Sequence, residues 1–325
     1  MNLITLSSVG IRQIKALVCG VMVMSVGTFA HGASIIYTED AASPNGIVGE
    51  STLGGSTSTL VSGLDIPRGV AIDSLNSRIY YSQHSGIIAY SNFSGSSQTT
   101  VIASGAGNGT RGMAVDPAGG FIYWAAFIDN VINRAALDGS GQTTLISGLD
   151  TPASVSVDTV NSKLYWVERG TTLRIARSDL DGSNIETLVS SVDIDGGYLA
   201  VDPSHSFLFF DVRDGVGNTF IHRTDLDGSN GTNIATLSTA STSFEGITID
   251  PENEVVYFGN SSGAGTISSI AYSGGSVSTV ASGISNIHGL AFIPEPSTYA
   301  LIISILSLAG VLWMRRKYLK VGDVK

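Results

Sequence analysis

Four ionisable residues stand at equivalent places in a series of sequence repeats, where their side chains could meet and do chemistry. Each repeat begins with a short apolar segment that ends in Asp, and the residue just before that segment differs from repeat to repeat. The six residues at this place are Arg68, Arg111, Ala153, Gly197, Glu245 and His288. Two arginines beside a Glu and a His favour an anionic or polyhydroxyl ligand. The alternative is a solvated, salt-bridged rim without a ligand.

Catalysis is a second chemistry to weigh, because a Glu and a His within reach of each other can serve as general acid and base. The chain has no nucleophile elbow, zinc-binding HExxH sequence or phosphate-binding loop. Arg68 and Arg111 would repel a divalent cation bound by Glu245 and His288. The Asp-Gly turns lack the D-x-D-x-D-G series of a calcium loop. We therefore expect no catalytic residue, metal or cofactor, with calcium unsupported, and keep an enzyme as an alternative.

The elements that must position these residues are short strands in a regular repeat. The apolar segments end at Asp73, Asp116, Asp158, Asp202 and Asp250, in steps of 43, 42, 44 and 48 residues. An aromatic pair follows each Asp, and then come an apolar-x-Gly turn and a final segment similar to TLVSG. Four strands in about 40 to 45 residues is the period of a β-propeller blade.

Incomplete repeats at the two ends complement each other. Residues 289–293 match the first strand of a unit, while residues 36–37, 53–55 and 59–63 supply the second, third and fourth. Five whole units and one shared unit predict an all-β fold, a six-bladed β-propeller with four-stranded antiparallel blades. A strand from the C-terminal side would close the ring and leave few exposed sheet edges.

The repeat resembles the YWTD repeat of low-density-lipoprotein-receptor class B, which also forms a six-bladed propeller. The best matches are Tyr123-Trp124, Tyr165-Trp166 and the LDGS turns at 180–183 and 226–229. The resemblance covers roughly residues 34–293. It departs from the family where the Thr-Asp pair becomes Ala125-Ala126, Val167-Glu168 or Asp211-Val212. The resemblance implies a fold rather than a function, with the inter-blade contacts of that Asp only partly kept.

Other recurring residues have structural explanations. Side chains alternate along a strand, so one aromatic of each pair should enter the packing between blades and the other the opposite face. The aspartates at the strand ends and in the LDG turns, among them Asp138, Asp181 and Asp227, should cap turns through backbone amides.

Composition and charge limit the fold class and the classes of binding partner. The 325 residues include 39 Gly and are only 14% charged, which suits many short strands joined by tight turns. Residues 34–297 hold 10 basic and 26 acidic residues, a formal charge of −16, which argues against nucleic acid or an anionic lipid surface as partner. Cys19 is the single cysteine and lies in the N-terminal segment, so the mature domain would have no disulfide or thiolate.

The N-terminus is typical of a secretory signal peptide. Arg12 and Lys15 precede an apolar region at residues 16–29, and small residues follow. We expect a signal helix within residues 1–33, with cleavage after Ala30 or Ala33, rather than an uncleaved anchor.

The C-terminal segment, residues 294–325, has three elements in order. They are Pro294-Glu295-Pro296, an apolar stretch at 299–314, and Arg315-Arg316-Lys317. This order resembles the PEP-CTERM sorting domain of Gram-negative bacteria, which implies processing by an exosortase. The tail at residues 318–325 is longer than usual for the family. The apolar stretch spans about 24 Å as a helix, and basic flanks place its end in the cytoplasm. A plain single-span anchor is the alternative.

These features favour an exported, surface-sorted binding module without catalytic activity. We expect the domain at residues 34–293 in the cell envelope or outside the cell, transiently anchored in the inner membrane by the C-terminal transmembrane helix. The expected partner is a protein or glycan at the surface, such as one in an exopolysaccharide matrix, bound at Arg68, Arg111, Glu245 and His288. The alternatives are a hydrolase or lyase at the channel mouth and a purely structural surface protein.

Overall fold

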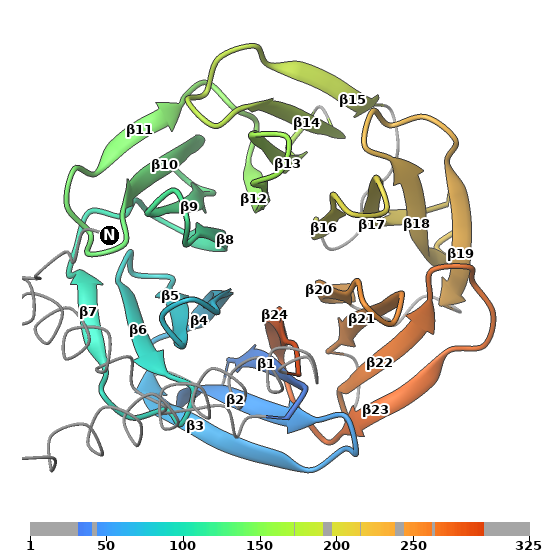
Figure 1. The fold of residues 1–325 in the computed structure, drawn as a ribbon, viewed down its shortest axis with the longest axis horizontal. Helices are drawn as coiled ribbons and strands as arrows, with labels where there is room; N and C mark the ends of the chain where they lie inside the picture. Colours follow the sequence, from blue (N-terminus) through green and yellow to red (C-terminus); the bar gives the residue numbers. More distant parts are fainter. Residues whose placement is uncertain are drawn as a thin grey trace, which may run out of the picture. The chain divides into compact units, whose positions relative to one another are not determined.

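The computed structural model describes residues 32–40, 44–171, 173–190, 197–214, 216–237, 244–261 and 264–295. These residues form a ring of six antiparallel sheets with four strands each (Figure 1). Gly32–Glu295 make up one compact unit. The predicted signal and transmembrane helices fall outside the described residues. Within the described residues, no helix has the length and apolar character needed to cross a membrane.

The blades are numbered I to VI along the chain, starting from the blade that closes the ring. Blade I consists of β24 (Ile287–Ile293), β1 (Ser34–Glu39), β2 (Gly46–Thr52) and β3 (Thr57–Leu64). Blade II consists of β4 (Pro67–Asp73), β5 (Arg78–Gln83), β6 (Ile88–Asn92) and β7 (Thr99–Ile102). Blade III consists of β8 (Thr110–Asp116), β9 (Phe121–Ala126), β10 (Val131–Ala136) and β11 (Thr143–Ile146).

Blades IV to VI complete the ring with the same strand order. Blade IV consists of β12 (Pro152–Asp158), β13 (Lys163–Arg169), β14 (Leu173–Asp179) and β15 (Glu186–Ser190). Blade V consists of β16 (Leu199–Asp202), β17 (Phe207–Arg213), β18 (Thr219–Asp225) and β19 (Thr232–Leu237). Blade VI consists of β20 (Phe244–Asp250), β21 (Val255–Asn260), β22 (Thr266–Ala271) and β23 (Ser278–Ser282).

Ring closure follows the prediction. The C-terminal strand β24 pairs with the N-terminal strand β1, with Ser34 opposite Ile293 and Glu39 opposite Ile287. One detail of the sequence interpretation is wrong, because residues 53–55 lie in the turn between β2 and β3 and the third strand precedes them. The two ends of the described chain therefore lie side by side, at the end of β24 away from His288.

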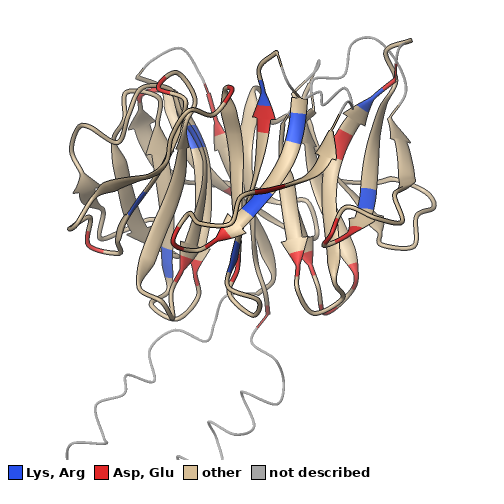
Figure 2. Ribbon diagram, turned by 90° about the horizontal axis from the view of Figure 1, so that it is seen from above, with Lys and Arg blue, Asp and Glu red and all other residues tan. Residues whose placement is uncertain are grey.

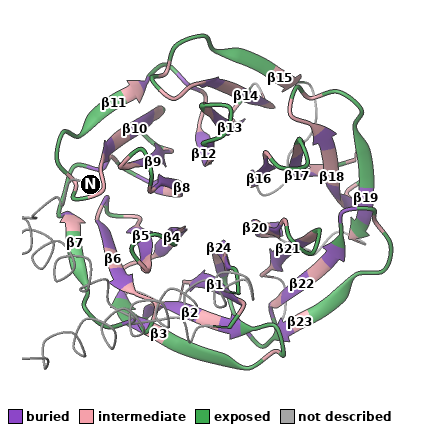
Figure 3. Ribbon diagram, viewed as in Figure 1, coloured by how far each residue is buried: buried purple, intermediate pink, exposed green. Residues whose placement is uncertain are grey.

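The core lies between the blades, as the aromatic pairs predict. The first aromatic of a blade packs in one apolar cluster with the second aromatic of the next blade, which confirms the expected alternation. These pairs are Tyr80 with Trp124, Tyr123 with Trp166, Tyr165 with Phe210, Phe209 with Phe258, and Tyr257 with Tyr37. The exposed stretches belong mainly to the outermost strands (Figure 3).

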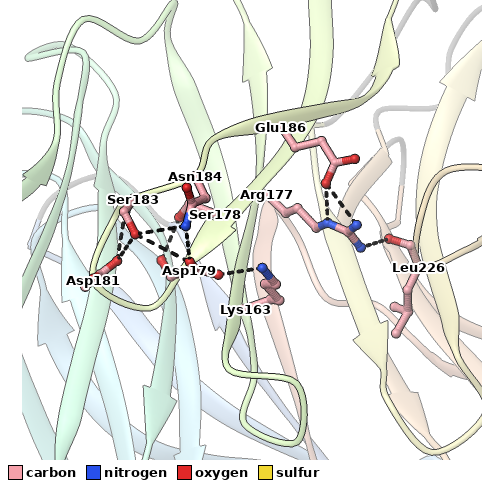
Figure 4. A network of polar contacts seen from close by, with 9 residues as sticks. All are labelled: Lys163, Arg177, Ser178, Asp179, Asp181, Ser183, Asn184, Glu186 and Leu226. Atoms are coloured by element: carbon pink, nitrogen blue, oxygen red, sulfur yellow. Dashed lines mark hydrogen bonds and ion pairs between the residues drawn. The ribbon is translucent and has the colours of Figure 1, made fainter.

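The recurring aspartates cap turns, as predicted. Oδ1 of Asp116 accepts a hydrogen bond from the Gly119 backbone N–H at 2.8 Å, and Oδ1 of Asp158 accepts one from Asn161 at 2.9 Å. In the LDG turns, the Ser183 N–H donates to Asp181 at 2.9 Å (Figure 4). Seen from the side, acidic residues recur in the turns along the lower rim (Figure 2).

Arginines on the third strands link three consecutive blade pairs. Nη1 of Arg177 in blade IV donates to the Leu226 carbonyl of blade V at 2.9 Å (Figure 4). The same link recurs from Arg134 to the Leu180 carbonyl at 3.2 Å and from Arg223 to the Tyr272 carbonyl at 2.9 Å. A charged donor on a backbone carbonyl stabilises the junction between blades.

Candidate functional site

The residues selected from the sequence lie at one end of the central channel. The six inner strands surround the central channel (Figure 1). A cavity of about 230 Å³ there has a lining that includes Arg68, Arg111 and Tyr198. A β-bulge interrupts the inner strand of blade II at Arg68 and Gly69, and that of blade III at Arg111 and Gly112. Bulges re-aim side chains, and here they lie where the site residues enter the channel.

Close approach of neighbouring inner strands explains why glycine follows several site residues. A Cβ on Gly69 would lie 2.1 Å from the Arg111 carbonyl oxygen, and one on Gly112 would lie 2.6 Å from Cα of Ser154. Only glycine fits such contacts. These glycines let the inner strands approach closely enough to bring side chains of different blades together.

Three of the four site residues form one connected group. Nη1 of Arg68 lies 2.7 Å from the ring nitrogens of His288, and Nδ1 of His288 lies 3.5 Å from Oε2 of Glu245. Arg68 and His288 are 220 residues apart in sequence. Asp40 adds a carboxylate that lies 3.6 Å from Nη2 of Arg68 and 3.6 Å from Nε2 of His288. The group thus combines a guanidinium, an imidazole and two carboxylates.

Glu245 stays ionised within this group. Burial alone would raise the pKa of the Glu245 carboxyl, but hydrogen bonds with His288 and Tyr198, together with positive charge nearby, hold it below its ordinary value. The Tyr198 hydroxyl donates to Oε2 of Glu245 at 2.7 Å. Burial and the neighbouring carboxylate raise the pKa of Tyr198. A carboxylate held in this way is a stable hydrogen-bond acceptor and a weak general base.

Arg111, the fourth site residue, lies apart from this group. Its guanidinium carbon is 4.5 Å from the centre of the Phe127 ring, a cation–π contact. Within the described part of the chain its guanidinium has no hydrogen-bond or ion-pair partner, while its backbone carbonyl accepts from the Ser82 hydroxyl at 3.2 Å. The structure therefore places Arg111 on the channel with its charge available to a ligand.

Sequence reasoning missed three residues of this region: Asp40, His84 and Tyr198. Tyr198 had a signal, since the other inner strands carry Gly69, Gly112, Ser154, Gly246 and Gly289 at its place. Asp40 and His84 follow the second strands of blades I and II, and no feature of the sequence indicated that they belong to the site. Of the remaining predicted positions, Ala153 is buried and Gly197 has a φ of 78°.

The described residues contain neither a cluster of metal ligands nor the complete sorting motif. Across the described ranges, no three His, Asp or Glu side chains gather where they could hold a metal ion. Pro294 and Glu295 follow β24 at the edge of the described chain. Pro296, Arg315 and Arg316 lie outside the described residues, so the sorting motif stays a prediction.

Comparison with known proteins identifies related repeats. No family model matches the chain. Protein cueball of Drosophila grimshawi is 28% identical over 193 residues, 55% of this chain and 32% of its own length. Low-density lipoprotein receptor-related protein 5 of Mus musculus is 36% identical over 119 residues, 35% of this chain and 7% of its own length. The chain thus spans about a third or less of these relatives.

Solved structures match over most of the chain. The nidogen/laminin complex matches with a TM-score of 0.67 and 17% identity over 81% of this chain and 99% of the other. TolB from Acinetobacter baumannii matches with a TM-score of 0.65 and 16% identity, over 90% of this chain and 75% of the other. A gluconolactonase from Xanthomonas campestris matches with a TM-score of 0.56 and 16% identity, over 80% of this chain and 91% of the other. At such identities the likeness shows the fold alone, and the six-bladed YWTD-like propeller fits it.

Proposed function

We propose that this protein is an exported binding module that recognises a ligand at the channel mouth without catalysing a reaction. The observation that carries the proposal is Arg111, which lines the cavity and whose guanidinium, among the described residues, has a cation–π contact with Phe127 but no hydrogen bond or ion pair. An arginine in such a place is well suited to hold an anionic or hydroxyl-bearing group. Ligand pockets of this kind combine a concave surface with a few convergent polar groups.

The structural neighbours support a binding role. One of them is described as a complex of nidogen with laminin, so a propeller of this shape can take part in protein recognition. A protein ligand and a glycan both fit a mouth that alternates donors and acceptors. Because folds host many functions, the chemistry of the mouth carries more weight than the likeness.

Export and surface sorting belong to the same proposal. The signal peptide would direct the chain out of the cytoplasm, and an exosortase would process the PEP-CTERM-like tail after transient anchorage in the inner membrane. Both ends of the described chain lie at the end of β24 opposite His288, about 20 Å away for a seven-residue strand. The proposed partner of the mouth is an exopolysaccharide or a protein.

A hydrolase or lyase is the second candidate, because Glu245 and His288 lie 3.5 Å apart. The lowered pKa of Glu245 keeps it deprotonated near neutral pH, so it has no proton to donate there and is a weak base. Elemental analysis of the full chain distinguishes the two functions. Tightly bound, stoichiometric calcium or zinc would favour the enzyme.

The first experiment is a glycan-array measurement with the full chain, beside the exopolysaccharide of the host. Its variant is Arg68→Ala/Arg111→Ala. The matched control is Arg78→Ala/Lys163→Ala, which also removes two positive charges. These two residues lie at the ends of β5 and β13 that are away from the channel mouth. Binding lost only in the first variant supports recognition at the mouth. Binding kept by both variants contradicts it, and absence of binding by the parent protein rules out a glycan ligand.

A further inference from the structure

Two buried nitrogen atoms at the channel mouth lack hydrogen-bond partners in the described part of the protein. They are Nε of Arg68 and Nδ1 of His84. A buried polar group without a partner costs roughly 1–3 kcal/mol, so such groups call for an acceptor from outside the chain. Their position next to Arg111 suggests which acceptor that is.

His84 lies between the two arginines of blades II and III. Its backbone N–H donates to the Ile66 carbonyl at 3.0 Å, just before β4, and its carbonyl accepts from Gly109 at 3.3 Å, just before β8. Burial lowers the pKa of His84, and the charges of Arg68 and Arg111 lower it further. The backbone contacts place His84 between the segments that lead into the two inner strands carrying Arg68 and Arg111.

Hydrogen-bond donors are in excess on this side of the mouth. Arg68 uses its Nη atoms toward His288 and Asp40, which leaves Nε unused. The Arg111 guanidinium packs on the Phe127 ring and makes no hydrogen bond or ion pair within the described residues. In the tautomer with its proton on Nδ1, His84 adds another donor. A carboxylate, with two oxygens and about four acceptor positions, matches this set.

The other side of the mouth offers different chemistry. Glu245 is an ionised acceptor, and the Tyr198 hydroxyl that donates to it lines the same cavity. Acceptors of this kind suit hydroxyl groups of a ligand. The cavity volume of about 230 Å³ is below the roughly 300–1,000 Å³ of pockets for drug-sized ligands, and suits a single sugar ring better than a polymer segment.

We propose that the mouth binds the terminal hexuronic acid of a polysaccharide. The carboxylate lies between the guanidinium groups of Arg68 and Arg111, beside His84, and the ring hydroxyls face Glu245 and Tyr198. This inference rests on the proposed binding function at the same site and names its ligand class. An acidic protein segment would supply the carboxylate without the ring hydroxyls.

The test is calorimetric titration of the full chain with three probes. D-galacturonate carries the carboxylate and the hydroxyls, D-galactose carries the hydroxyls alone, and glutarate carries carboxylates without a sugar ring. We expect galacturonate to bind roughly 10- to 100-fold more tightly than galactose, the range for charged hydrogen bonds. We expect glutarate to bind more weakly than galacturonate. Equal binding of galactose, equal binding of glutarate, or no binding of galacturonate at millimolar concentration overturns the inference.

Variants then locate the site. Arg111→Gln and His84→Leu should each weaken galacturonate binding about tenfold or more, whereas His84→Asn keeps a donor near the place of Nδ1 and should retain most of it. Lys163→Gln, at the far end of β13, should leave binding unchanged. Galacturonate binding unaffected by both Arg111→Gln and His84→Leu would also overturn the inference. If galacturonate fails while the array experiment still shows mouth-dependent binding, the binding function stands without this ligand class.

Discussion

Removing one hydroxyl at the ring closure should destabilise the whole propeller. Thr38 on β1 is fully buried, and its Oγ1 donates to the Arg68 carbonyl of blade II at 2.7 Å. The same oxygen accepts from the Gly289 N–H on β24 at 2.8 Å. A β-bulge at this point leaves Gly289 outside the regular ladder. One side chain therefore joins the two ends of the chain to the neighbouring blade.

The size of the effect follows from the two hydrogen bonds. Thr38→Val keeps the shape of the side chain but leaves the Arg68 carbonyl and the Gly289 N–H without this partner. Each unsatisfied buried group costs roughly 1–3 kcal/mol, so we expect a loss of about 2–6 kcal/mol in the free energy of unfolding. For a domain of this size, the loss corresponds to a decrease in Tm of roughly 4–24 °C.

Urea unfolding of the full chain, followed by tryptophan fluorescence, measures this loss, since Trp124 and Trp166 are fully buried. Thr38→Ser is the control, because it keeps the hydroxyl and removes only a methyl group. It should lose much less stability than Thr38→Val. The reasoning is refuted if Thr38→Val unfolds within about 0.5 kcal/mol of the parent protein, or if both variants lose the same amount.

Two further changes test the blade junctions and the mouth. Arg177→Met removes the hydrogen bond to the Leu226 carbonyl and should cost about 1–2 kcal/mol in urea unfolding. Lys163→Met, which breaks a partly exposed ion pair with Asp179, should cost less than about 1 kcal/mol, and equal losses would contradict the inter-blade role. The lowered pKa of Glu245 means that its carboxylate stabilises the fold above the unfolded-state pKa of about 4.3. That contribution disappears as the pH falls through the folded-state pKa. Glu245→Gln should therefore be less stable than the parent at pH 7, with the difference vanishing in acid, and a pH-independent difference would show that the charge is not responsible.

Short-range patterns in the sequence were sufficient to predict most of the fold. Asp116 and Asp158 cap turns only a few residues away, and Trp124 and Trp166 alternate with their neighbours along a strand. Both features depend on local backbone geometry, so they repeat visibly in the sequence. At one of the places where the chain departs from the YWTD pattern, a side chain binds backbone groups of its own blade. Asp211 accepts hydrogen bonds from the N–H groups of Gly197 and Tyr198.

The sequence by itself determined the blade period, the six-bladed ring closed by both ends, and the positions facing the channel mouth. It could not show which side chains meet there, because contacts such as Arg68 with His288 join residues 220 positions apart. Their distance depends on ring closure and on bulges that turn side chains into the channel. Only the tertiary structure brought Asp40 and Tyr198 into the charged group, separated Arg111 from it, and placed His84 between the two arginines.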